Sequence, residues 1–179
     1  MKDLTRILVG GISLTVLGVL VLMNISYDNR EIDLRNQSVA QEDVKKTIFD
    51  KTWKVIKQQA GVTEQYKEGF KEVYSEMMAG RYGNARGGAL MSWIKESNPQ
   101  FDASMFKQLM TTIEALRAEY AREQKKSIDI KKMHDDLRMK VPSGWFMDSD
   151  VTELKIAIIS STKTEKIFES GIEDDISVF

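Results

Sequence analysis

The stretch "DASMFKQLMTTIEALRAEYAREQKKSIDIKKMHDDLRMKVP", residues 102–142, is expected to form the longest helix. Its apolar side chains recur at intervals of three and four, as on one face of an α-helix. Asp102 is a suitable N-cap, and Pro142 ends a helix that would extend roughly 55 Å. So narrow a stripe on so long a helix is typical of a helical bundle or a coiled coil. Its members are Phe106, Leu109, Ile113, Leu116 and Tyr120; the register is looser around Ile128 and Met133 and returns at Leu137 and Val141.

Shorter helical patterns precede this segment. The first ends at Gly61, after which Thr63 and Glu64 offer a cap and an acidic first turn for the next helix. A third covers residues 89–96 and stops at Asn98-Pro99, because the residue before proline avoids the helical region. Their apolar faces are Phe49, Trp53, Ile56 and Ala60; Tyr66, Phe70, Val73 and Met77; and Leu90, Trp93 and Ile94. Aromatic residues at this spacing are typical of a core, so residues 28–142 predict an all-α antiparallel bundle with long helices.

The glycine-rich run "GRYGNARGG", residues 80–88, lies between two of these helical segments. A phosphate-binding loop needs a Lys-Ser or Lys-Thr pair after its last glycine, and it joins a strand to a helix. Neither condition is met, and nothing else converges on Arg81 or Arg86. We therefore expect a flexible helix–helix connector with glycine breakers.

Near the N-terminus, "ILVGGISLTVLGVLVLMNISY", residues 7–27, contains no charged side chain. As a helix it would extend roughly 30 Å, which is enough to cross the hydrocarbon core of a bilayer. A cleaved signal peptide is the competing interpretation, since Lys2 and Arg6 precede the run. The apolar core is longer than usual for such peptides, and no A-x-A cleavage site follows Met23. The sequence thus predicts a short flank at residues 1–6 and an uncleaved transmembrane anchor at residues 7–27.

Basic residues near the span give an expectation for its orientation. Lys2, Arg6 and the terminal amine precede the span, whereas Arg30 and Arg35 follow it. This difference of one charge favours a cytoplasmic N-terminus and a body on the periplasmic side of a bacterial inner membrane.

Residues 143–179 change in character and predict an extended tail. The run "KIAII" and its flanks, residues 153–160, form a short β-branched stretch that predicts a strand. Such a strand is not stable alone, so it would pair with residues 176–179 or with another copy of the chain. A disordered end over the last dozen residues is the alternative.

Composition excludes several functions. The 179 residues include 26 basic and 27 acidic side chains, a formal net charge of -1, whereas nucleic-acid binders show a basic excess. The absence of cysteine excludes disulfides, thiolate metal sites and cysteine nucleophiles. We therefore expect no nucleic-acid partner.

Few residues are candidates for chemistry. His134, the only histidine, is followed by Asp135 and Asp136, but one histidine beside adjacent acids does not supply the ligands of a zinc site. We expect it at the surface or packed near Met133. The acids at 173–175 lack the ligand spacing of a calcium loop. Residues 160–162 are expected to cap the strand, because no nucleophile motif surrounds them. We expect no catalytic, metal or cofactor-binding residues, no small-molecule substrate and no enzyme activity.

The order of these features resembles the LemA family, and within it a divergent type of bacteriophages and bacteria. The resemblance rests on "SYDNREIDLRNQ" after the span, "FDKTWKVIKQQAGV" and "ESNPQFD" in the body, and "DIKKMHDDLRMKVPSG" at the end of the long helix. It covers roughly residues 26–147 and implies a membrane-held bundle of long antiparallel helices. The family's arginine pair followed by Asp-Leu-Ile-Pro is absent after Trp53. The resemblance carries no catalytic residues to this chain.

Together these features predict a membrane-anchored, non-enzymatic helical scaffold or adaptor that binds the lipid bilayer and a protein partner. One alternative is a self-assembling membrane protein that pairs through its C-terminal strand. Another, suggested only by the bacteriophage resemblance, is an envelope modifier that excludes a second infection.

Overall fold

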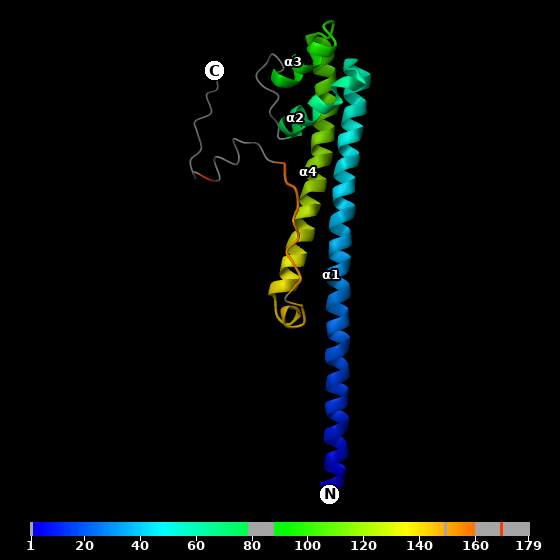
Figure 1. Ribbon diagram of the computed structural model, residues 1–179, viewed down its shortest axis with the longest axis vertical. Helices are drawn as coiled ribbons and strands as arrows, with labels where there is room; N and C mark the ends of the chain where they lie inside the picture. Colours follow the sequence, from blue (N-terminus) through cyan, green and yellow to red (C-terminus); the bar gives the residue numbers. More distant parts are fainter. Residues whose placement is uncertain (1, 79–87, 149, 160–168, 170–179) are drawn as a thin grey trace. The chain divides into compact units, whose positions relative to one another are not determined.

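The computed structural model describes residues 2–78, 88–148, 150–159 and 169 (Figure 1). Within these residues the chain is all-helical and forms no strand, which confirms the predicted fold class. Its contacts divide it into two compact units. The first comprises Met1–Glu42 and Lys126–Ile156, and the second comprises Asp43–Lys125 and Ala157–Phe179.

Helix α1 (Lys2–Ala60) is unbroken and contains the predicted anchor, residues 7–27. It is long and apolar enough to cross a membrane, and no part of its most apolar stretch is buried in the protein. The exposed large apolar side chains between Leu4 and Ile25 range upward from the 44% exposure of Leu20. In water such a surface is costly at roughly 25 cal/mol per Å². We therefore expect an apolar environment around this stretch of α1.

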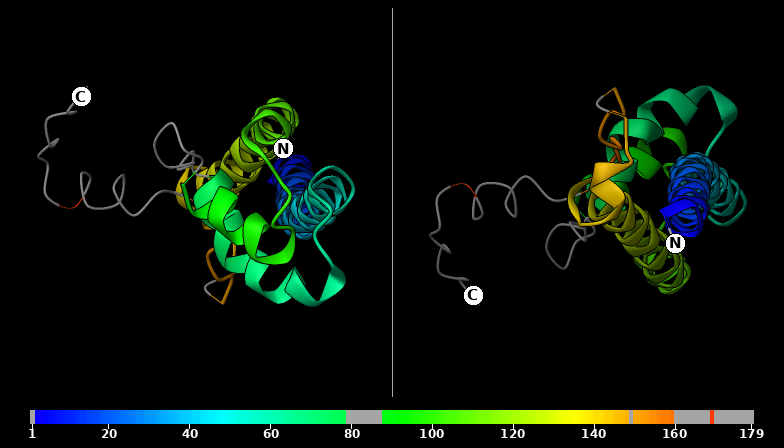
Figure 2. Two further views of the ribbon diagram at one scale, coloured as in Figure 1. Left: turned by 90° about the horizontal axis from the view of Figure 1, so that it is seen from above. Right: turned by 90° about the horizontal axis from the view of Figure 1, so that it is seen from below.

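The second unit holds the aromatic core. The end of α1, the turn η1 (Glu64–Tyr66), α2 (Lys67–Met78), α3 (Gly88–Ser97) and the start of α4 (Ala103–Met139) surround it. Figure 2 shows α2 and α3 lying steeply across α1 and α4. Trp53, Phe70 and Ile113 are among its most buried side chains, as their helical spacing predicted. Phe70 contacts four aromatic rings, those of Phe49, Trp53, Tyr74 and Trp93.

Two of the helix ends in this unit have clear causes. Asp102 caps α4, because its Oδ1 accepts hydrogen bonds from the backbone N–H groups of Ser104 and Met105 at 2.8 and 2.9 Å. The bonds from Met105 and Ser104 hold the pKa of Asp102 below its ordinary 3.8. At the end of α1, Gly61 has φ of +66° and Asn98 donates to the carbonyl of Ala60 at 2.9 Å.

Thr63 makes no side-chain cap hydrogen bond, so the cap predicted there does not form. The backbone N–H of Tyr66, from which such a cap would accept, already donates to the carbonyl of Thr63 at 3.1 Å. The backbone N–H of Thr63 donates to Ser97 Oγ at 3.2 Å. The predicted connector of residues 80–88 lies outside the described residues, apart from Gly88, which begins α3.

Helices α1 and α4 run antiparallel in each unit. In the second unit Lys51 pairs with Glu119 at 2.7 Å, and Gln59 lies nearer the end of α1 and contacts Thr112, nearer the start of α4. In the first unit the core is small. Leu34 of α1 packs with Ile130 and Leu154, and the half-buried Leu137 lies against them.

The packed face of α4 follows a strict seven-residue repeat that continues beyond the apolar part. After Tyr120 the buried positions are Ser127, Ile130 and His134, whereas Ile128 and Met133 are about 40% exposed. The expected loosening of the apolar register around Ile128 and Met133 is thus present, and the expected return holds at the half-buried Leu137 but is wrong at Val141, which is 64% exposed because α4 ends at Met139. Ser127 and His134, both polar, occupy buried positions of the seven-residue repeat at which apolar residues are usual.

Residues 151–159 run along the helices without forming a strand, so the strand predicted at 153–160 is absent over its described part. Side chains take the place of a neighbouring strand. Arg35 donates to the carbonyl of Thr152 at 3.0 Å in the first unit, and in the second Lys45 donates to that of Ala157 at 2.8 Å. Gln124 pairs with both backbone groups of Ile159, accepting at 2.8 Å and donating at 3.3 Å. These four backbone groups are therefore satisfied without a neighbouring strand.

Candidate functional site

A cluster of charged side chains lies in the packed face between α1 and α4 of the first unit. Oε1 of Glu31 accepts hydrogen bonds from Nε of Arg35 at 2.8 Å and from the guanidinium NH2 of the same residue. Nε2 of His134 lies 3.0 Å from the same oxygen. We call these three residues the Glu31 cluster. It joins the two helices through one carboxylate oxygen.

The structure corrects the expected place of His134. Its side chain is completely buried, at 0% exposure, rather than at the surface. The reason is its position in α4, seven residues after the buried Ser127 and fourteen after Tyr120. Glu31 supplies a polar partner for Nε2 of the buried imidazole.

The ionisation of Glu31 follows from these partners. Burial alone would raise its pKa, but the hydrogen bonds from Arg35 and His134 outweigh burial, and the pKa lies below its ordinary 4.5. The carboxylate is therefore ionised at neutral pH and only accepts hydrogen bonds. Nε2 of His134 must then carry the proton that is donated.

A second group of charges flanks the cluster on α4. Nζ of Lys131 donates to Oδ2 of Asp135 at 2.7 Å and also to Oε1 of Glu153 in the tail segment. The hydrogen bonds to Asp135 and Glu153 raise the pKa of Lys131. Nζ of Lys131 thus has two carboxylate partners within the first unit.

Two buried polar atoms have no hydrogen-bond partner among the described residues of this region. They are Nδ1 of His134 and Oδ1 of Asp135, which lie 3.9 Å apart. This distance is too long for a hydrogen bond.

A histidine between two carboxylates can serve as an acid–base group only if substrate reaches it. Two shallow hollows flank the cluster. One lies between α1 residues 37–41 and α4 residues 126–133, and the other between α1 residues 35–42 and tail residues 152–155. Neither is lined by His134. Among the described residues no group of three or more His, Cys, Asp or Glu side chains is placed to hold a metal ion. The geometry is that of an internal clamp between helices.

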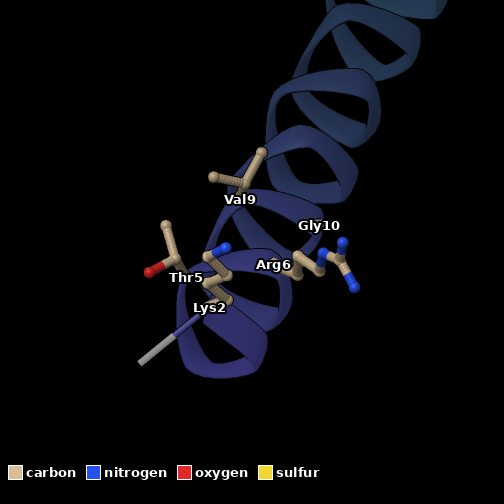
Figure 3. A pocket seen from close by; sticks show the side chains of 5 residues that line it. All are labelled: Lys2, Thr5, Arg6, Val9 and Gly10. Carbon is tan, nitrogen blue, oxygen red and sulfur yellow. The ribbon is translucent and has the colours of Figure 1, made fainter.

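A further hollow lies at the start of α1 (Figure 3). Its lining consists of Lys2, Thr5, Arg6, Val9 and Gly10, all from one helix. One helix face has no opposite wall, so this hollow cannot enclose a ligand.

The other candidates from the sequence fall outside the described residues. These are the glycine-rich residues 80–87 with their arginines, the hydroxyl residues 160–162 and the acids 173–175. Glu31 and Arg35, in contrast, were missed by the sequence analysis. The signal for Glu31 was the seven-residue recurrence of Glu31, Ser38, Lys45 and Thr52 along α1.

Comparison with family models, with curated proteins and with solved structures finds no match for the chain. The class that fold and site define is a helical protein with one candidate membrane-spanning helix. The resemblance to the LemA family stays a prediction from its sequence motifs.

Proposed function

We propose that the chain is a non-enzymatic, single-pass membrane scaffold or adaptor, whose helical body presents a surface to a protein partner. The observation that carries this proposal is the exposed apolar stretch of α1, which continues as the same helix into the packed face at Glu31 and Leu34. A bilayer is the surrounding that satisfies such a stretch.

The non-enzymatic part is supported by the use of the polar residues. The only histidine is completely buried against Glu31, and neither hollow beside it is lined by the ring. Arg35, Lys131 and Asp135 are engaged by neighbouring groups of the same unit. Catalysis needs such groups to face a site that substrate can enter.

For location we propose a bacterial inner membrane, with the N-terminus in the cytoplasm and the body on the periplasmic side. The support is the excess of one positive charge before the span. We propose that this scaffold or adaptor is of the LemA type, because the motifs of the body and of the long helix are similar to those of that family.

The structure gives less reason than the sequence to expect assembly through a C-terminal strand. Its motive was an unpaired β-branched run, but side chains of α1 and α4 bind the carbonyls of Thr152 and Ala157 and both backbone groups of Ile159. We therefore propose the adaptor alone.

The test is crosslinking of intact membranes that contain the full chain, followed by detergent extraction and measurement of the native mass of the captured species. The adaptor predicts a second polypeptide in fixed ratio to this chain. A species that contains only multiples of the chain's own mass would overturn it. Recovery of the chain in the soluble fraction after alkaline carbonate treatment, before any crosslinking, would remove the membrane part of the proposal.

A further inference from the structure

The turn that follows α4 has the position and the side chains of a second membrane contact. We infer that residues 139–147, here called the α4 turn, lie in the headgroup region of the same leaflet from which α1 emerges. This inference rests on the proposed membrane anchoring of α1. It adds a lipid-binding surface to the body itself.

The position of the α4 turn is given by its contacts with α1. The ring of Phe146 lies 5.7 Å from that of Tyr27, and Nδ2 of Asn24 donates to the carbonyl of Phe146 at 3.1 Å. Asn24 and Tyr27 are the residues at which the apolar stretch of α1 ends. The turn therefore lies at the height where the apolar stretch of α1 ends. Figure 1 shows the end of α4 and this turn beside α1.

The turn exposes three large apolar side chains, together with Lys140 and Pro142. Met139, Val141 and Trp145 are 73%, 64% and 76% exposed. Trp145 is the most exposed large apolar side chain among the described residues. Tryptophan and tyrosine are enriched at the membrane–water interface, where an amphipathic ring meets both phases. Trp145 and Tyr27 thus form a pair of interfacial aromatic residues on two segments.

The charge of the turn fits a lipid surface. The stretch "LRMKVPSGWFM", residues 137–147, contains Arg138 and Lys140 and no acidic residue. Acidic residues resume on both sides, at Asp136 and Asp148. Nζ of Lys140 pairs with Asp136 at 2.7 Å, and the Lys140 side chain is still 67% exposed. Basic side chains beside an apolar surface are attracted to phosphate headgroups, whereas acidic ones are repelled.

The turn is also held in one conformation. Backbone N–H of Gly144 donates to the carbonyl of Lys140 at 2.7 Å, and Ser143 Oγ donates to the same carbonyl at 2.9 Å. A Cβ at position 144 would lie 2.6 Å from the carbonyl oxygen of Arg138, so only glycine fits there. A rigid turn presents Trp145 without the entropy cost of ordering a loop on binding.

The experiment uses the absence of cysteine from the natural sequence. Val141→Cys places one thiol in the α4 turn. Val39→Cys is the matched control, since Val39 of α1 is 62% exposed in the same unit and lies roughly 22 Å along the helix from Asn24. Each full-length variant is labelled with an environment-sensitive fluorophore and reconstituted in phosphatidylcholine and phosphatidylglycerol vesicles, with and without lipids brominated near the headgroup.

We expect the label at 141 to shift to the blue in vesicles and to lose roughly half of its emission or more to brominated lipid. The label at 39 should do neither. Met139→Cys, also in the turn, should behave as position 141 does and guards against a local effect of one label.

Two results would overturn the inference while the anchor stands. In one, the label at 141 responds to a water-soluble quencher as strongly as the label at 39, so the turn faces water. In the other, position 141 is protected from the aqueous quencher and also from brominated lipid, so protein such as a second copy covers the turn. Failure of the anchor itself has a different signature, because the labelled chain would then not float with the vesicles.

Discussion

Glu31 binds Arg35 of its own helix and His134 of α4 through a single carboxylate oxygen. The three side chains form a clamp at the start of the packed face of α1. A buried polar pair such as Glu31 and His134 contributes little net free energy against an apolar equivalent, but loss of Glu31 leaves the buried His134 ring without this partner. It thereby fixes which residues of α1 and α4 face each other.

The Glu31 cluster predicts that the stability of the protein depends on pH. Because the folded-state pKa of Glu31 is lowered, its contribution is fully present above the ordinary pKa of 4.5 and is lost as the pH falls through the folded-state value. Glu31→Gln should lower the free energy of unfolding at pH 7 by about 1–3 kcal/mol, since a hydrogen-bonded charge is removed beside buried donors. Below the folded-state pKa the two proteins should differ less. The measurement is denaturant unfolding in mild detergent, followed by circular dichroism across pH 2–8.

A matched control lies two residues further along the same helix. Asp33 pairs with Arg30 at 3.3 Å, and both side chains are about half exposed. Asp33→Asn should change the free energy of unfolding by less than about 1 kcal/mol at pH 7, because exposed ion pairs contribute little. An equal effect of both substitutions would show that Glu31 acts through general charge and not through the clamp.

At the scale of the element, α4 offers two isoleucines in different surroundings. Ile113 is completely buried in the aromatic core, whereas Ile128 is 42% exposed. Ile113→Ala should lower the free energy of unfolding by about 2–5 kcal/mol, through lost burial and a cavity. Ile128→Ala should cost less than about 1 kcal/mol. Thermal melting of both variants is the measurement, and equal losses would show that the packed face of α4 is misplaced.

The tail segment offers a prediction about Gln124. Its amide replaces a strand partner for Ile159, with hydrogen bonds to both backbone groups. Gln124→Ala should raise the hydrogen-exchange rate of the Ile159 amide by roughly tenfold, the equivalent of one hydrogen bond of about 1.4 kcal/mol. Gln124→Glu keeps the acceptor for that amide and should retain more of the protection. Unchanged exchange in Gln124→Ala would mean that the segment is held by other contacts.

The same elements show what the sequence could predict. The apolar spacing located the helices and core residues such as Trp53, Phe70 and Ile113, because a buried face there consists of apolar side chains. It missed the polar half of the α1 face, since hydropathy does not register a buried Glu31 or Lys45. Those positions follow only from the seven-residue repeat. The strand failed for another reason. Strand propensity describes residues 153–160 alone. Arg35, Lys45 and Gln124, which are distant in sequence, bind backbone groups of this segment in place of a strand.

At the scale of the whole molecule, α1 has two roles in one helix. Its apolar stretch is exposed, and its continuation carries the packed face at Glu31 and Leu34 without a break in the helix. A flexible tether would let the first unit move freely against the bilayer. A continuous helix instead gives the unit a fixed height and rotation about the span, which the α4 turn contact at Asn24 requires.

Lysines placed in the span test whether the apolar stretch holds the protein in a membrane. Val16→Lys combined with Val19→Lys puts two charges in its middle, at positions that are 53% and 50% exposed. Each should cost roughly 3 kcal/mol of insertion free energy, so the double variant should leave the carbonate-resistant membrane fraction. Val39→Lys with Val44→Lys is the matched control on the same helix, at 62% and 41% exposure, and should stay in that fraction. Retention of the Val16 and Val19 variant at the natural level would mean that a surface other than the α1 stretch binds the membrane, and the α4 turn would be the first region to examine.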